Sequence, residues 1–204
     1  MPTKLPRQFY LQDTVTVARA LLGCVLWRKI GRLLLAARIV ETEAYLGAND
    51  QASHARRGLR SERNASMYLE GGHAYVYFTY GMHWCLNVVT QEADTAEAVL
   101  LRGAEPIRGI EQMRKRRPKA KRDFDLTNGP GKICMAMDID RKLDGESFEG
   151  ARLYITGRDI DLDESQIGVT TRIGVEGAPE AAMWPLRFII RGNRYVTPNR
   201  VNAL

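Results

Sequence analysis

Apolar residues in the first half of the chain gather in short runs that end at turn residues, which is the pattern of β-strands. Residues 24–29 and 33–45 are rich in Val, Ile and Leu, and the segment 30–32 between them contains Gly31. This arrangement predicts two strands joined by a turn.

A second pair of strands is predicted at residues 74–79 and 83–90, which meet at Tyr80, Gly81 and Met82. Gly81 supplies the backbone angles that a tight hairpin turn needs. The hairpin would carry bulky apolar residues at an exposed tip, which is unusual. Further strands are expected at residues 98–102 and near Leu153, Arg172 and Phe188.

Helices are predicted between these strands. Asp13 is suited to cap a helix that runs to Leu22 and is closed by Gly23. Residues 105–117 predict a helix despite Gly109, and residues 131–137 predict another, opened by the turn at residues 128–130. The polar, Arg-rich segment 49–64, which contains His54, predicts a long loop or irregular turns.

Strand pairs with inserted helices, and without a regular alternation of strand and helix, predict an α+β fold. No linker or break in composition divides the chain, so we expect a single domain over residues 1–204. Its centre would be a curved, mainly antiparallel β-sheet with inserted helices and a protruding β-hairpin.

The strand at residues 33–45 contains the most informative polar side chains. Alternate residues of a strand share a face, so Glu41, Glu43 and Tyr45 should project to one side and Val40 and Thr42 to the other. Glu41 and Glu43 would lie about 7 Å apart along the strand. Alternation alone does not separate either glutamate from an ordinary surface carboxylate.

The composition fits a folded globular domain, with 45% hydrophobic and 26% charged residues. No apolar stretch is long enough to span a bilayer, and the first six residues lack the apolar middle of a secretory signal, so we expect an intracellular protein. Cys24, Cys85 and Cys134 are far apart, and we expect buried free thiols.

Positive charge raises the expectation of a nucleic-acid partner. The formal net charge is +6, and basic residues cluster at residues 114–122. This run could lie along a phosphate backbone, and it is equally consistent with a solvated, mobile loop.

Five motifs, spread over most of the chain, resemble those of the alkyladenine (3-methyladenine) DNA glycosylase family. They are residues 38–47 (RIVETEAYLG), 75–82 (YVYFTYGM), 99–106 (VLLRGAEP), 129–132 (GPGK) and 185–188 (PLRF). The resemblance implies a monofunctional DNA glycosylase of base excision repair. Such an enzyme flips alkylated or deaminated purines out of duplex DNA and hydrolyses the N-glycosidic bond with water.

The resemblance assigns Glu43 as the catalytic carboxylate and Arg102 as the residue that helps to hold the water against it. A carboxylate suits this task, because positive charge develops on the sugar in the transition state and the water must be deprotonated. The same resemblance favours Glu43 over Glu41, which could be a structural residue.

The resemblance also assigns a binding pocket for the flipped base. Tyr45, His54 and Tyr77 match the residues that stack on the base, and Asn87 matches the asparagine that clashes with the exocyclic amine of guanine. On the residues alone, ordinary sheet tyrosines and a surface histidine would be the simpler interpretation.

The DNA contacts implied by the resemblance are Tyr80, Met82 and Lys132. Tyr80 would enter the minor groove as a wedge with Met82 beside it, and Lys132 would contact a phosphate at a helix start. His83 and Trp84 depart from the family pattern and could alter the floor of the pocket.

The expected partner is double-stranded DNA that contains damaged purines, bound by a monomer without a membrane, a metal or an organic cofactor. The preferred lesion among 3-methyladenine, 7-methylguanine, hypoxanthine and ethenoadenine stays open. Two other hypotheses remain, a non-catalytic binder of distorted DNA and a basic α+β RNA-binding module. The second would leave the pairing of Glu43 with Arg102 unexplained.

Overall fold

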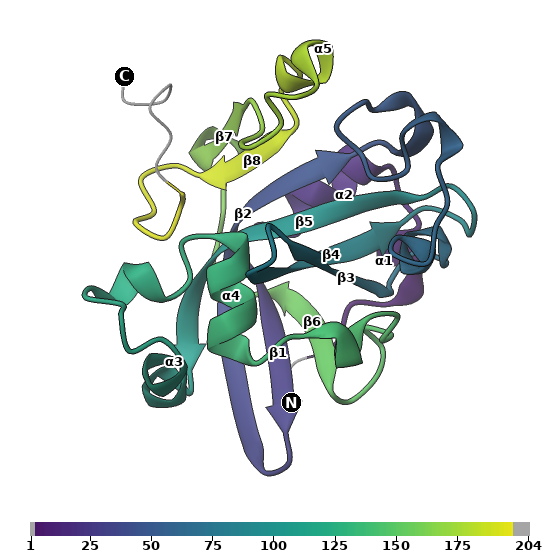
Figure 1. The fold of residues 1–204 in the computed structure, drawn as a ribbon. Coiled ribbons are helices and arrows are strands. Elements are labelled where there is room, and N and C mark those ends of the chain that lie inside the picture. Colours follow the sequence, from purple (N-terminus) through teal and green to yellow (C-terminus); the bar gives the residue numbers. More distant parts are fainter. Residues whose placement is uncertain (1–2, 198–204) are drawn as a thin grey trace.

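The computed structural model describes residues 3–197, and an eight-stranded antiparallel sheet runs through them (Figure 1). Six strands follow the order β3-β4-β5-β2-β1-β6, and β8 pairs with β2 and β7. The expected α+β fold around a mainly antiparallel sheet is therefore confirmed. The strands are β1 (Cys24–Ile30), β2 (Leu33–Tyr45), β3 (Ala74–Thr79), β4 (His83–Thr90), β5 (Glu97–Arg108), β6 (Leu153–Arg158), β7 (Ile167–Thr170) and β8 (Arg187–Ile190).

In residues 3–197, two short helices precede β1 and three more lie between later strands. They are α1 (Arg7–Tyr10), α2 (Thr14–Ala20), α3 (Ile110–Arg116), α4 (Pro130–Met137) and α5 (Pro179–Ala182). The predicted cap of α2 is confirmed, because the Asp13 side chain accepts a hydrogen bond from the Thr16 amide. Residues 49–64 form turns that include the 3₁₀ segment Arg56–Gly58, as predicted, and a second 3₁₀ segment, Gly47–Asn49, leads into them. No helix of residues 3–197 is long and apolar enough to cross a membrane.

The strand β2 is the central element of the sheet, because it pairs with β1, β5 and β8 along its length. Its two faces have different surroundings. The Thr42 hydroxyl donates to the Ala18 carbonyl of α2, whereas Glu41 and Glu43 on the other side approach Arg102 of β5. The predicted alternation of side chains is therefore confirmed.

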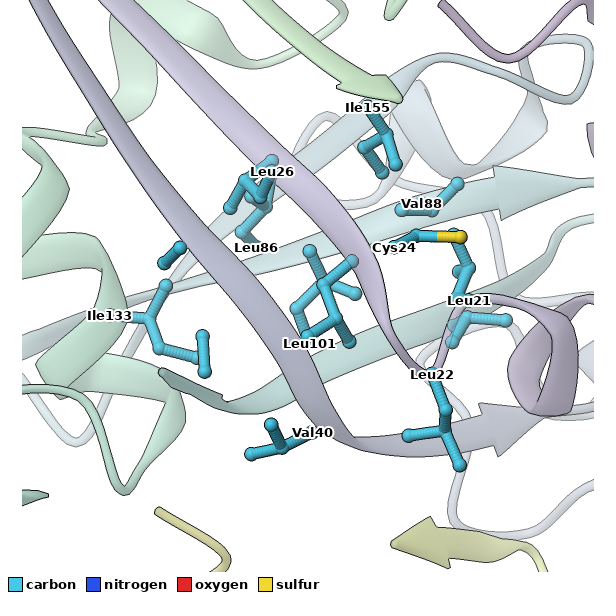
Figure 2. Packing of buried hydrophobic residues seen from close by; sticks show 14 of the residues in the cluster. Leu21, Leu22, Cys24, Leu26, Val40, Leu86, Val88, Leu101, Ile133 and Ile155 are labelled. Carbon is cyan, nitrogen blue, oxygen red and sulfur yellow. The ribbon is translucent and has the colours of Figure 1, made fainter. Parts of the chain in front are cut away.

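Leucine, isoleucine and valine side chains from helices and strands form the main core. Figure 2 shows Leu21 and Leu22 after α2, Leu26 from β1, and Leu86 and Leu101 from β4 and β5 in this cluster. These side chains have almost no exposed surface. Burial on this scale makes β2 a rigid base for the polar side chains that it carries.

Two sequence predictions need correction. The predicted helix at residues 105–117 is wrong at its start, because Glu105 to Arg108 extend β5 and pair with residues 36–38 of β2. At residues 36–38, β1 occupies only one edge of β2, and the hydrogen bonds that residues 105–108 form with the other edge outweigh their helix propensity. Gly109 then turns the chain with a left-handed φ of 75°, and α3 begins at Ile110. The strand predicted near Arg172 is β7, which ends at Thr170, so Arg172 itself lies after the strand.

The hairpin of β3 and β4 has the predicted exposed tip. Tyr80 and Gly81 have φ angles of 51° and 64°, so both adopt left-handed backbone conformations. The exposed fractions of Tyr80 and Met82 are 79% and 67%, which leaves both side chains in solvent. In Figure 1 the turn lies beside α4. A Cβ on Gly131 of α4 would lie 2.8 Å from His83 Cβ, so the helix and hairpin pack closely.

Candidate active site

Glu43 has no exposed surface, and hydrogen bonds hold both oxygens of its carboxylate. The Ile173 backbone amide donates to Oε1 at 2.8 Å, and the Tyr45 hydroxyl donates to Oε2 at 3.0 Å. Burial raises the pKa of the Glu43 carboxyl above its usual range, although Arg102 and the Ile173 amide oppose this rise. A carboxyl with a raised pKa is a stronger base once it is ionised.

A buried ion network joins Glu43 to Glu41. Arg102 Nε lies 3.2 Å from Glu41 Oε1 and 3.4 Å from Glu43 Oε1. Arg187 Nε donates to Glu41 Oε1 at 2.6 Å, and the Thr197 amide donates to Oε2 at 2.7 Å. Glu41 therefore has charged or backbone partners on both oxygens, and it holds Arg102 next to Glu43.

The space around this network is tight. A Cβ on Gly103 would lie 2.9 Å from Glu41 Oε2 and 2.7 Å from the Tyr195 carbonyl. Only glycine fits at this position of β5 without a shift of its neighbours. The sequence motif around Arg102 thus includes the residue that lets Glu41 approach β5.

A cavity of about 440 Å³, here called the large cavity, opens above the network. Its walls combine aromatic side chains from β2 and β3 with basic side chains and the start of α4. A cavity of this volume accommodates a nucleobase together with its sugar. Its lining residues are Tyr45, Tyr77, Thr79, Tyr80, His83, Cys85, Leu100, Arg102, Arg117, Gly129, Pro130, Gly131, Lys132, Ile173 and Gly174.

A second cavity of about 130 Å³, here called the small cavity, adjoins the first. The two share Tyr45, Tyr77, Thr79, Tyr80 and Gly174, so they form one aromatic recess with two lobes. His54 and Asn87 line the small cavity.

His54 is held against the aromatic residues of β3. Its Nδ1 atom lies 2.7 Å from the Tyr75 hydroxyl, and its ring meets the Tyr77 ring edge to face at 4.5 Å. Burial lowers the pKa of His54 to about 4, and the nearby Arg63 and Arg56 contribute to this shift. At neutral pH the ring is therefore uncharged, which suits stacking on a base.

Asn87 is buried on β4, and its amide nitrogen donates to the Tyr75 carbonyl at 3.0 Å. This bond fixes the direction of the side chain at the small cavity. A rigid amide can reject a substituent that a mobile one would accommodate.

The structure brings most of the predicted site residues together. Arg102, Tyr45, Tyr77, Tyr80 and Lys132 line the large cavity. Lys132 donates to the Asn128 side chain at 2.7 Å, at the start of α4. Met82 lies at a separate cavity of about 330 Å³ with Trp84 and Arg116. Glu43 has no exposed surface and lines neither the large nor the small cavity, but it contacts Tyr45, Arg102 and Ile173, which line the large one.

His83 and Trp84, the two residues that depart from the family pattern, lie in different surroundings. His83 lines the large cavity, so it does contribute to the pocket surface. Trp84 instead packs on Phe78, with ring centroids 4.8 Å apart, and does not line the large or the small cavity. Of the two residues, only His83 is therefore placed where it could alter the pocket.

Sequence reasoning missed the contribution of residues 172–174. Ile173 binds Glu43, Gly174 lines both cavities, and Arg172 forms an ion pair with Asp50 in which neither side chain has exposed surface. Neither a motif nor a periodic pattern marks this segment. Arg117 belongs to the basic run, but nothing in the sequence places it at the large cavity.

The basic run at residues 114–122 is partly helical, since its first three residues belong to α3. Arg114 pairs with Asp123, and Arg122 pairs with Asp125. Part of the charge is therefore neutralised within the segment. The three cysteines are buried and unpaired, as predicted. Within residues 3–197, His, Cys, Asp and Glu side chains form no group of three or more that could hold a metal ion.

Comparison with known proteins identifies the family of this chain. The sequence profile of the methylpurine-DNA glycosylase family matches residues 8–194. This chain belongs to that family. The match confirms the resemblance on which the site assignments depend, and it confirms the expectation of an enzyme of the DNA glycosylase class.

The chain is similar to several bacterial proteins over almost their whole length. Three of them, which carry the provisional name 3-methyladenine DNA glycosylase, are compared below. The chain is 47% identical over 195 residues to the protein of Bdellovibrio bacteriovorus, covering 95% of this chain and 98% of the relative. Identity is 45% over 193 residues for Carboxydothermus hydrogenoformans and 43% over 201 residues for Clostridium botulinum, with the same coverage.

Proposed function

We propose that this member of the methylpurine-DNA glycosylase family flips a damaged purine into the aromatic recess and hydrolyses its N-glycosidic bond with a water activated by Glu43. The observation that carries this proposal is the position of Glu43. Its carboxylate is held by Tyr45 and Ile173, beside Arg102, and all three of these residues line the large cavity.

The reaction needs two contributions from the carboxylate. As the bond between the sugar and the purine breaks, the purine leaves with the bonding electrons and positive charge develops on the sugar, which an ionised Glu43 stabilises. Water then adds to the sugar carbon, and Glu43 accepts its proton. A water at Tyr45, Arg102 and Ile173 would reach the carboxyl by replacing one of the present hydrogen bonds.

The base would stack between Tyr45 on one side and Tyr77 with His54 on the other. Base–aromatic stacking contributes about 1–3 kcal/mol per base, which offsets part of the cost of unstacking the duplex. Tyr80, at the exposed hairpin tip, would fill the space left by the base. The neutral His54 and the fixed Asn87 amide would select purines by shape at the small cavity.

Contact with the DNA backbone would come from Lys132 and Arg117 at the large cavity. The start of α4 adds free backbone amides, which favour an anion. The pocket, the wedge and the basic residues all belong to one chain, so a single copy presents a complete site. We therefore expect a monomer, and its DNA substrate would place it in the cytoplasm of a bacterium like those of its relatives.

A base-release assay tests the proposal. Duplexes with one hypoxanthine or one 3-methyladenine should yield free base and an intact abasic strand. Glu43→Gln should still bind lesion DNA but release no base, whereas Glu92→Gln, at an exposed glutamate outside both cavities, should be fully active. Base release by Glu43→Gln at the wild-type rate would overturn the assignment. Tight lesion binding without release by the wild type would indicate a non-catalytic binder.

A further inference from the structure

Arg172 and Asp50 form a buried ion pair at the back of the recess. The Arg172 guanidinium binds the Asp50 carboxylate with both terminal nitrogens, at 2.5 and 2.9 Å, and neither side chain has exposed surface. The same guanidinium donates to the carbonyls of Ala44 and Ala181 at 3.0 and 3.1 Å. The position of the guanidinium is therefore fixed from several directions.

This guanidinium lies over the ring of Tyr45, with Cζ 4.7 Å from the ring centroid. Tyr45 lines both the large and the small cavity, whereas the Arg172 side chain is completely buried. The cation therefore lies on the side of the ring that faces away from the recess. The opposite side of the ring remains for a bound base.

The Arg172 charge changes how strongly the Tyr45 ring can attract a second cation. A ring attracts a cation through the negative potential of its faces. A cation that already lies on one face weakens that potential on the other face. The Tyr45 hydroxyl acts in the opposite sense, because it donates to the Glu43 carboxylate and gains electron density. Replacement of the Arg172–Asp50 pair leaves this hydrogen bond in place, so it removes only the contribution of the pair.

We propose that Arg172 is a specificity-determining residue that shifts the preference of the recess from cationic alkylated purines towards uncharged damaged purines. Its charge reduces the attraction of Tyr45 for a positively charged base and leaves the stacking of a neutral base almost unchanged. Hypoxanthine and ethenoadenine represent the favoured class, and 7-methylguanine represents the disfavoured class. This inference rests on the proposed function, since it concerns the base bound at Tyr45.

Arg172 also has a positioning effect that the experiment must separate from its charge. The next residue, Ile173, donates its backbone amide to Glu43 at 2.8 Å. A change that only displaced this amide would lower the rate on every lesion by the same factor. The ratio of rates on a cationic and a neutral lesion cancels that common factor, so it reports the charge effect.

The test uses single-turnover base release from two duplexes that differ only in the lesion, 7-methylguanine or hypoxanthine. The double variant D50N/R172Q replaces the ion pair by two amides that can hydrogen-bond to each other. The ratio of the 7-methylguanine rate to the hypoxanthine rate should rise about threefold to tenfold over the wild type. The matched control Arg172→Lys keeps the charge, and its ratio should stay at the wild-type value.

A second variant covers the case in which D50N/R172Q does not fold. D50L/R172M replaces the pair with apolar side chains of similar size, an exchange that is often neutral or stabilising in buried sites. It should show the same rise in the ratio. An unchanged ratio in the variant that folds would overturn the proposal and leave Arg172 a structural role. Failure of the proposed function would look different, because the wild type would then release neither base.

Discussion

The Nε atom of Arg102 lies 3.4 Å from the Oε1 atom of Glu43, so a guanidinium faces the proposed catalytic carboxylate inside the protein. The two residues come from neighbouring strands, β5 and β2. The same Nε also lies 3.2 Å from Glu41 Oε1. Arg102 is thus shared between two carboxylates, and Arg102 and Glu41 act in opposite directions on the pKa of Glu43.

Replacement of Arg102 by Gln should move the acidic limb of the pH–rate profile to higher pH. Arg102 lowers the pKa of Glu43, so its loss raises that pKa, and the ionised carboxylate is then lost earlier as the pH falls. The maximal rate should also drop about 10- to 100-fold, because Arg102 would donate one charge-assisted hydrogen bond to the attacking water. Single-turnover base release between pH 4.5 and 8.5 measures both effects. Arg102→Lys, which retains the charge, should show the smaller shift.

Replacement of Glu41 by Gln should move the same limb in the opposite direction. The Glu41 charge raises the pKa of Glu43, so its removal lowers that pKa and keeps the base ionised at lower pH. The substitution also leaves Arg187 buried without its carboxylate partner, which should reduce the free energy of unfolding by about 3–5 kcal/mol. Urea titration measures this loss. A shift of the acidic limb to higher pH would contradict the effect of the Glu41 charge on the pKa of Glu43.

The fold was predictable where local signals agreed with tertiary contacts. The alternation of residues 38–45 placed Glu41 and Glu43 on one face, Asp13 marked the start of α2, and Gly81 marked the hairpin. The strand extension at residues 105–108 could not be predicted in this way. It depends on the free edge of β2, a partner more than 60 residues earlier in the chain.

The site was predictable only as far as the motifs reached. They identified Glu43, Arg102 and the aromatic residues, but they did not mark partners that are distant in sequence. Arg187 lies in the motif at residues 185–188, but no pattern pairs it with Glu41, 146 residues away, and Arg172 lies in no motif and is 122 residues from Asp50. A single arginine or aspartate has no pattern that reveals burial, so such pairs emerge only when the chain has folded.

His54 should make the stability of the protein depend on pH between about 6.5 and 4. Its folded pKa is lowered from 6.5 to about 4 by burial and by Arg63 and Arg56, so the unfolded chain binds a proton first as the pH falls. The contribution of His54 to the free energy of unfolding is therefore fully present above pH 6.5, and it is lost progressively as the pH falls towards 4. Urea titrations at pH 7.5, 6.0, 5.0 and 4.5 measure this change. In His54→Gln the free energy of unfolding should fall less over this interval, and an identical fall would rule out His54 as its source.

Tyr80→Ala should separate DNA distortion from folding. The side chain is 79% exposed, so the free energy of unfolding should change by less than about 0.5 kcal/mol. Base release should nevertheless slow, because the truncated residue no longer fills the space left by the flipped base. A 2-aminopurine next to the lesion should also show less fluorescence increase on binding. Met183→Ala, at a side chain that is 75% exposed and lines neither cavity, is the matched control and should behave as the wild type. Wild-type rates for Tyr80→Ala would mean that the hairpin tip does not act as a wedge.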